Sequence, residues 1–348
     1  MVNFPSEIWL RIFCFLDVNG TKQEKNYGQL LRICKAAYYA GLRVIYYYPK
    51  INARNYASFF YAITHRPYGI FVHHLNLVNA TYTAKASMTS RMLRLCSKNL
   101  ISFYSPQSGI GFTAFRALSQ CTKLEILDLS VLTLKADLFY LFEGVKDLKK
   151  LHSIIFPPIS QVSMRSINCW PTSLKSVSLS GGFTDEFLSE SLFPSSIRRL
   201  GISHCPFVTD TGILMFLSRI GHQLSSLSIS FPMPQLSRRG LDSVLLLCPN
   251  LKKLSISVNY ITSDFISAIP EEGHGLEILD LTFSGNLISG IELLKPDNLS
   301  SALVDEKLQS LKRLRWSIQL GWREQSDEVQ DLVELMNDQG GEAFVAFQ

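Results

Sequence analysis

The chain has 348 residues, enough for one or two globular domains, and its hydrophobic fraction of 47% is ample for a large core. Its longest apolar runs, such as residues 244–248, are far shorter than the roughly 18 to 20 residues of a membrane-spanning helix, and no secretory signal pattern is visible, so we expect an intracellular protein, cytoplasmic or nuclear, with no membrane partner. The net charge of +5 combines +12 over residues 1–323 with seven acidic residues after Arg323, and the spread of the basic residues predicts no nucleic-acid partner.

A first helix is predicted directly after Pro5, a residue that is favoured at helix starts. An apolar stripe that faces a single core covers a little over about 100° of a helix. Six apolar residues within nine positions exceed that stripe, so we expect a partner protein to cover part of this helix. They are Ile8, Trp9, Ile12, Phe13, Phe15 and Leu16.

The order of residues in this segment and the next resembles an F-box. The matching residues are Phe4, Pro5, Glu7, Ile8, Ile12, Phe13, Leu16, Ile33, Cys34, Lys35 and Tyr38. The chain departs from the family's usual Leu and Trp at Phe4 and Tyr38, and its polar connection over residues 18–28 is longer than usual. The alternative is an ordinary N-terminal helical hairpin.

The F-box resemblance, over residues 1–48, implies docking on a Skp-family linker protein and, through it, on a cullin scaffold. The residues implied for linker binding are Phe4, Pro5, Ile8, Ile12, Phe13, Leu16, Ile33, Cys34 and Tyr38. A connecting helix is predicted within residues 49–71, because Tyr56, Phe59, Phe60 and Ile63 have helical spacing and Pro67 ends the run. We expect it to pack the F-box onto the segment that follows.

Residues 72–323 repeat a short pattern of an apolar residue, two variable residues, an apolar residue, one variable residue and an apolar residue. Ten copies start at Val72, Leu100, Leu124, Leu151, Leu174, Ile197, Leu224, Leu251, Leu276 and Leu311. Steps of 23 to 35 residues match leucine-rich repeats, in which each unit is a strand plus a helix. The sequence therefore predicts an α/β fold, a helical F-box followed by a curved solenoid with parallel strands on its concave face and helices on its convex face.

Helix starts are predicted where Thr184, Thr209 and Thr262 stand ahead of apolar runs, because their hydroxyls can cap a helix. The unit around Ile197 is similar to the cysteine-containing repeats that often follow F-boxes, and that resemblance accounts for the positions of Cys121, Cys205 and Cys248. Seven cysteines with no Cys-x-x-Cys pair predict buried thiols rather than disulfides or zinc.

Side chains alternate along a strand, so the variable positions of each repeat should face the concavity. The central column reads Asn76, Tyr104, Asp128, Ile155, Ser178, Gly201, Ser228, Ser255, Asp280 and Arg315. Its neighbour reads Ser130, Pro157, Ser180, Ser203, Ser230, Ser257, Thr282 and Ser317. The side chains in the middle of this surface are small and many carry hydroxyls. The surface is either a groove for an extended peptide or a structural surface without a binding role.

A basic margin is predicted at the strand starts, formed by Lys175, Arg198, Arg199, Lys252, Lys253, Lys312 and Arg313. It would suit an acidic or phosphorylated segment, and the alternative is a charged edge that blocks pairing with other chains. The candidate substrate-binding residues are Tyr104, Asp128, Ser178, Arg199, Ser228, Lys253, Ser255, Asp280, Arg313 and Arg315.

Residues 324–348 are expected to form an acidic capping helix after Ser326, stopped at Gly340. The end of the tail either folds back toward Lys312 and Arg313, over the substrate groove, or is disordered.

No motif for catalysis, a metal or a cofactor is found, and even the pair His73 and His74 is a weak metal candidate. We therefore expect a non-catalytic substrate adapter of an SCF ubiquitin ligase, acting in ubiquitination and proteasomal degradation of an unknown protein. The alternatives are an F-box scaffold in a Skp complex without a cullin, and a leucine-rich module outside ubiquitin ligases.

Overall fold

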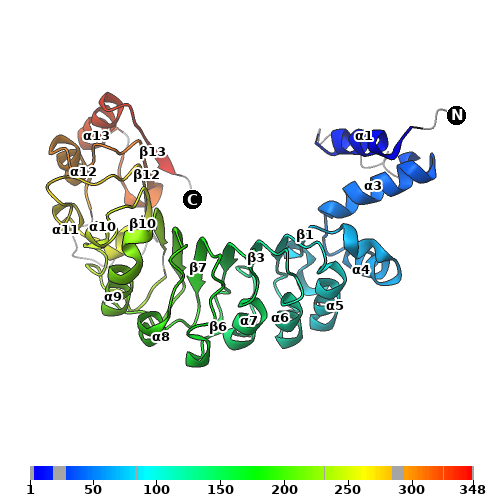
Figure 1. Ribbon diagram of the computed structural model, residues 1–348. Coiled ribbons are helices and arrows are strands. Elements are labelled where there is room, and N and C mark those ends of the chain that lie inside the picture. Colours follow the sequence, from blue (N-terminus) through cyan, green and yellow to red (C-terminus); the bar gives the residue numbers. More distant parts are fainter. Residues whose placement is uncertain are drawn as a thin grey trace. The chain divides into compact units, whose positions relative to one another are not determined.

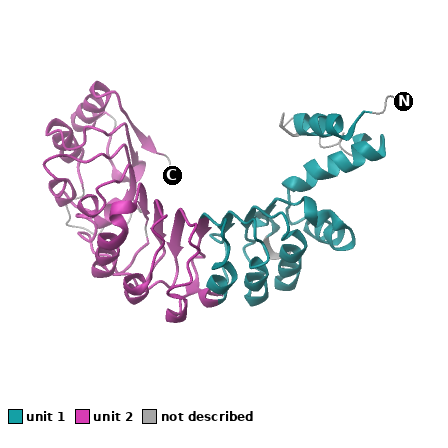
Figure 2. Cartoon of the chain, in the orientation of Figure 1, with its two compact units in different colours: residues 1–134, 140–152 teal, residues 135–139, 153–348 magenta. Residues whose placement is uncertain are grey.

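The structure is a computed structural model that describes residues 4–18, 29–83, 85–230, 232–283, 294–323 and 325–346. Two compact units make up the chain (Figure 2). Unit 1 contains residues 1–134 and 140–152, and unit 2 contains residues 135–139 and 153–348. Of the predicted polar connection over residues 18–28, Val18 is the last residue of helix α1 and residues 19–28 lie outside the described residues.

Unit 1 begins with helices and continues into the first repeats (Figure 1). Its α-helices are α1 (Ser6–Val18), α3 (Lys35–Tyr47), α4 (Tyr56–His65), α5 (Ala86–Cys96), α6 (Phe112–Leu118) and most of α7 (Leu138–Val145). Its 3-10 helices are η1 (Pro67–Phe71) and η2 (Val78–Thr83), and its strands are β1 (His74–Asn76), β2 (Ser102–Tyr104) and β3 (Ile126–Asp128), which pair in parallel.

Unit 2 is a parallel sheet with helices on one side (Figure 1). Within this unit the sheet is curved, and its strands lie on the concave side. The strand order is β5 (Ser153–Ile155), β7 (Ser176–Ser180), β8 (Arg199–Ser203), β9 (Ser226–Ile229), β10 (Lys253–Ser257), β11 (Ile278–Thr282), β12 (Arg313–Ser317) and β13 (Glu342–Ala346). A small second sheet pairs β4 (Ala136–Asp137) with β6 (Ser160–Gln161).

The helices of unit 2 shorten in several repeats. The α-helices are α8 (Asp185–Glu190), α9 (Asp210–Ile220), α10 (Val244–Leu247), α11 (Asp264–Ser267), α12 (Pro296–Val304) and α13 (Asp327–Asp338). The 3-10 helices are η3 (Met164–Ser166), η4 (Gly221–Gln223), η5 (Val258–Tyr260) and η6 (Ile318–Leu320). The repeat between β5 and β7 has η3 in place of an α-helix.

The ten predicted strands are all present, each starting two residues after the first apolar residue of its pattern. The three apolar positions of the pattern are buried; Leu251, Leu254 and Ile256, for example, are each 0% exposed. Because alternate residues of a strand point to opposite faces, burial of these residues sends the variable positions to the other face. The leucine-rich-repeat prediction is thus confirmed.

The C-terminal tail forms an eleventh strand that the sequence analysis did not predict. Helix α13 starts after Ser326 as expected and buries Val329, Leu332 and Met336. The chain then turns at Gly340, whose φ is +77°, and β13 pairs in parallel with β12. The tail does fold back toward Lys312 and Arg313 as one expectation had it, since the Glu342 N–H donates to the Lys312 carbonyl at 2.8 Å. It is neither disordered nor laid over the strand face, because the unpaired backbone groups of β12 provide it with ladder partners at the edge of the sheet.

Carboxylates tie neighbouring repeats of unit 2 together. Asp185 at the start of α8 accepts hydrogen bonds from the backbone N–H of Thr209 at 3.0 Å and from its hydroxyl at 2.6 Å. The Asp242 carboxylate binds Thr262 in the same way, at 2.7 and 2.8 Å. A Cβ on Gly212 would lie 1.8 Å from the Asp185 carboxylate, so glycine is required beside this tie.

The Asp185→Ala substitution is expected to lower the free energy of unfolding by about 1 to 3 kcal/mol, because it leaves half-buried donors of Thr209 without their acceptor. Urea denaturation of both proteins measures the difference. The matched control is Glu186→Ala on the same helix, an exposed position where we expect a change within about 0.5 kcal/mol. Equal losses from the two variants would show that the tie is not a source of stability.

Candidate functional site

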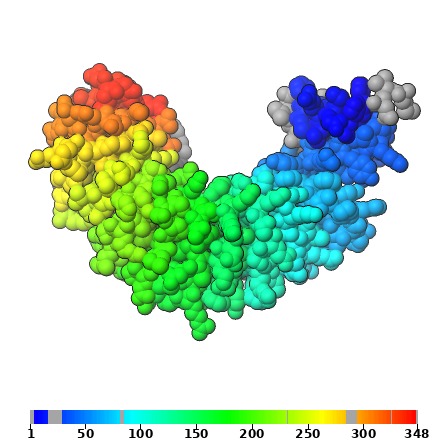
Figure 3. Space-filling view, in the orientation of Figure 1, coloured from blue at the N-terminus to red at the C-terminus, as the bar shows by residue number. Residues whose placement is uncertain are grey.

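The N-terminal helices of unit 1 share a small apolar core. Trp9 and Phe13 of α1 are buried against Ala37 and Ala40 of α3. Gly41 completes this contact, since a Cβ there would lie 2.8 Å from the Phe13 ring. Figure 3 shows α1, in dark blue, and α3, in lighter blue, forming one continuous surface.

Apolar side chains are exposed on α1 and in the residues just ahead of α1 and α3. Phe4 is 43% exposed, Ile8 39% and Ile33 53%, and Pro5 is exposed as well. Phe15 is 69% exposed and was missing from the predicted set, although its place in the crowded α1 sequence was a usable signal. Ile8 and Phe15 are seven positions apart on α1 and therefore share one side of that helix. Exposed apolar groups that lie together are typical of protein-docking surfaces.

The other predicted linker-binding residues lie deeper. Ile12, Leu16, Cys34 and Tyr38 are half-buried, and the expectation of direct contact is wrong for Phe13, which is 0% exposed. The Cys34 thiol accepts a hydrogen bond from the Ala37 N–H at 3.4 Å and caps α3. The Tyr38 hydroxyl lies 2.6 Å from that of Tyr68, and this hydrogen bond raises the pKa of Tyr38.

The strand faces of the two units carry the predicted columns in register. In unit 1, Asn76, Tyr104 and Asp128 align across β1, β2 and β3. The unit 2 register aligns Ile155, Ser178, Gly201, Ser228, Ser255, Asp280, Arg315 and Phe344. Two residues earlier on the strands, a second row contains Ser176, Arg199, Ser226, Lys253, Ile278, Arg313 and Glu342.

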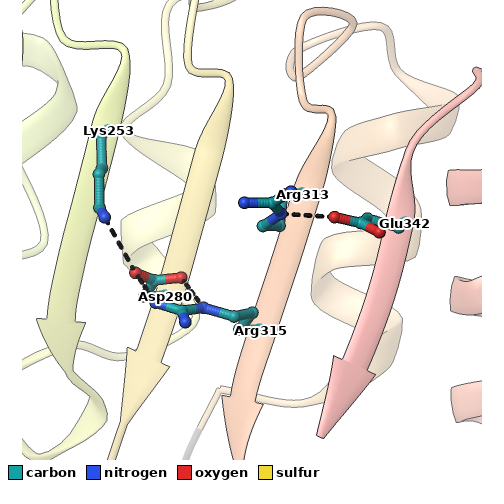
Figure 4. Close-up of polar contacts among 5 residues, drawn as sticks. All are labelled: Lys253, Asp280, Arg313, Arg315 and Glu342. Carbon is teal, nitrogen blue, oxygen red and sulfur yellow. Dashed lines mark hydrogen bonds and ion pairs between the residues drawn. The ribbon is translucent and has the colours of Figure 1, made fainter. Parts of the chain in front are cut away.

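A network of opposite charges occupies the C-terminal part of the unit 2 face. Asp280, whose side chain is 7% exposed, receives two hydrogen bonds from the Arg315 guanidinium, one of them at 2.5 Å, and has Lys253 at 3.8 Å (Figure 4). These bonds raise the pKa of Arg315. The Arg313 side chain donates to Glu342 of the last strand at 2.5 Å.

The strand-start margin is neutralised in the same region. The Glu277 carboxylate accepts from Lys252 at 2.6 Å and from Lys312 at 3.2 Å, and these cations lower its pKa. The prediction of an available basic row is therefore wrong for this end of the margin, because each cation there already has an acidic neighbour. Within the described part of unit 2, Arg199 is an exposed cation of the face without a carboxylate partner.

The predicted column that lies two residues after the central column is less accessible in unit 2 than expected. Ser180 is 5% exposed, Ser257 0% and Ser317 3%, whereas Ser203 and Ser230 are half-buried. These positions lie at the ends of the strands, where the chain turns toward the helices. The open floor of unit 2 therefore consists mainly of the first column, with Ser178, Gly201 and Ser228 beside Arg199.

Four of the seven cysteines are buried in the core, whereas Cys34 and Cys169 are half-buried and Cys14 is exposed. The prediction of buried thiols is therefore wrong for Cys14. All seven are free thiols, and burial raises the pKa of Cys96, Cys121, Cys205 and Cys248 to about 12. A thiol with so high a pKa carries almost no thiolate at neutral pH and is a poor nucleophile or metal ligand. In the part of the chain that the structure describes, no helix has the length and apolarity needed to cross a membrane.

Two relatives cover nearly the whole chain, although no family model matches it. Protein pof5 of Schizosaccharomyces pombe is 52% identical over 345 residues, 99% of either chain. The F-box protein YDR306C of Saccharomyces cerevisiae is 33% identical over 370 residues, 99% of this chain and 76% of the relative. The chain belongs to the F-box protein family.

This F-box protein thus combines an N-terminal module with leucine-rich repeats, an architecture for protein interaction. A more distant match in the solved structures is an internalin of Listeria monocytogenes, with a TM-score of 0.41 and 17% sequence identity over 81% of this chain and 76% of that one.

Proposed function

We propose that this F-box protein is a non-catalytic substrate adapter of an SCF ubiquitin ligase. Its N-terminal helices would dock on a Skp-family linker, and through it on a cullin, in the cytoplasm or nucleus. The observation that carries the proposal is the exposed apolar surface at Phe4, Ile8 and Ile33, since it coincides with motif positions and stays exposed among the described residues of unit 1. Such a side chain is stabilised when a partner removes it from water.

The open strand floor of unit 2 is the proposed substrate surface. Small residues at Ser178, Gly201 and Ser228 leave room for an extended peptide, and Arg199 supplies one unneutralised charge at the edge of that floor. A substrate held there while the linker holds the other module would meet the conjugating enzyme at high effective concentration. The adapter then contributes proximity, and its buried thiols have no part in bond chemistry.

The test uses affinity purification of three tagged proteins from cells with the proteasome blocked. They are the wild type, the variant Ser228→Arg, which fills the floor without touching the core, and the double variant Ile8→Asp with Ile33→Asp. Substrates are expected to accompany the wild type and the double variant but not Ser228→Arg. Those proteins should also become longer-lived when the gene is deleted. If no protein follows this pattern, the proposed substrate surface is wrong.

A complex of the chain with a Skp linker but no cullin is the alternative. In that case the captured proteins would show the same dependence on Ser228, but their half-lives would not change on deletion of the gene.

A further inference from the structure

Acidic residues are absent from a long part of unit 1. Residues 25–124 contain thirteen Lys and Arg and no Asp or Glu, so this stretch alone carries a charge of +13, against +5 for the whole chain. All twelve of these cations that the structure describes are exposed: Arg32, Lys35, Arg43, Lys50, Arg54, Arg66, Lys85, Arg91, Arg94, Lys98, Arg116 and Lys123. A surface with this imbalance attracts anions.

Two of these arginines share a pocket between α5 and α6. The pocket has a volume of about 330 Å³ and is lined by Arg94, Phe112, Thr113, Arg116, Ala117, Ser119 and Gln120. Its lining therefore offers two guanidinium groups, two hydroxyls and one side-chain amide. Arg91, Lys98 and Lys123 are further exposed cations on the same two repeats.

The guanidinium groups of Arg94 and Arg116 both contact uncharged partners. The Ser90 hydroxyl, on a residue 1% exposed, accepts from Arg94 at 2.6 Å and donates to the Thr113 carbonyl at 3.0 Å, which links α5 to α6. The Arg116 guanidinium lies over the Phe112 ring, 5.5 Å from its centre. Both arginines are thereby positioned without losing their charge.

This arrangement contrasts with unit 2. There Arg313, Arg315 and Lys252 each bind a carboxylate, whereas among the described residues neither Arg94 nor Arg116 forms an ion pair. Each of the two lies in the last turn of its helix, where the carbonyl ends favour a cation. The carbonyl ends explain why one cation lies at the end of each helix. They do not explain why the two arginines line the same pocket without a carboxylate partner in the described part of the chain.

We propose that the pocket between α5 and α6 binds a phosphorylated side chain of an acidic protein segment. A phosphate carries a charge of about −1.5 to −2 and three strong acceptor oxygens, which match two guanidinium forks and the neighbouring hydroxyl and amide donors. The flanking cations suit acidic residues on either side of the phosphate. A single-stranded nucleic acid fits less well, because it needs successive aromatic faces for its bases and the lining of this pocket includes one aromatic ring, Phe112, with Arg116 over one of its faces.

The test measures fluorescence anisotropy of labelled nine-residue peptides with the full chain. One peptide has a central phosphoserine flanked by glutamates, and its partner has alanine in place of phosphoserine. The wild type is expected to prefer the phosphopeptide by at least about tenfold, since the alanine peptide makes none of the charge-assisted hydrogen bonds that the phosphate accepts. Arg94→Gln with Arg116→Gln should remove the preference, and millimolar inorganic phosphate should compete.

The matched control is Lys149→Gln with Lys150→Gln, which removes the same charge from exposed positions of unit 1. It should weaken both peptides alike and keep their ratio. If the arginine variant unfolds, Thr113→Glu provides a second test, because it places a carboxylate in the pocket at an exposed position.

A wild-type ratio near one, or a ratio retained by both pocket variants, would overturn the proposal. So would tighter binding of a single-stranded RNA of equal charge. Because the peptides are tested on the isolated chain, the measured ratio does not depend on the proposed adapter role.

Discussion

Replacing Ile8 and Ile33 together with Asp is expected to reduce binding to a Skp-family linker by at least ~100-fold. Both side chains are exposed in the free chain, at 39% and 53%, so a carboxylate at each position stays in water until the partner tries to bury it. Burial of an unpaired charge is then strongly unfavourable. Truncation at central interface positions typically costs about 2 kcal/mol or more each, and every 1.4 kcal/mol is about tenfold in affinity.

Isothermal titration calorimetry with purified linker measures this loss. Ile12 is left unchanged, because it packs against the core of α1 and α3 and its replacement would also disturb folding. The control is Tyr61→Ser on α4, which removes an apolar group that is 64% exposed but lies outside the motif. Full affinity of the double variant would contradict the docking surface, and an equal loss from Tyr61→Ser would point to a different part of unit 1.

Leu254→Ala is expected to lower the free energy of unfolding by roughly 2 to 5 kcal/mol, because it opens a cavity in the centre of unit 2. Leu254 is 0% exposed on β10 and lies in register with Leu227 and Leu279 of the adjacent strands. Denaturation in urea, followed by circular dichroism, gives the change.

The adjacent residue supplies the control for the strand register. Ser255 is half-buried on the opposite face of β10, so Ser255→Ala should change the free energy of unfolding by no more than about 0.5 kcal/mol. The difference between two consecutive residues tests the assignment of faces directly. Similar losses at both positions would mean that the two faces of the strand are assigned wrongly.

The repeat pattern made the sheet predictable. A period of two along each strand and a period of 23 to 35 residues between strands fix which residue faces the core and which residues lie side by side. Ser178, Ser228 and Ser255 could therefore be aligned from sequence, and the register places them in one row. Helix starts followed in the same way, since the hydroxyls of Thr184 and Thr209 do cap α8 and α9.

Contacts between distant residues were not predictable from the pattern. The pairing of Asp280 with Arg315 depends on two strands 35 residues apart, and a list of exposed charges does not show which of them neutralise each other. The eleventh strand was missed for a related reason, because β13 has no leucine pattern of its own and forms on the free edge of β12. Burial of Phe13 likewise depends on the small residues of α3 that face it.

The composition of the native complex tests most directly the proposal that this F-box protein connects a cullin-based ligase to a substrate. The tagged chain is purified from its source cells under mild salt, and the Skp linker and the cullin are quantified by mass spectrometry against labelled standards. We expect linker, cullin and chain in near-equal amounts, with both partners lost together from the Ile8→Asp, Ile33→Asp variant. Recovery of stoichiometric linker without cullin, or retention of either partner by the variant, would contradict the account.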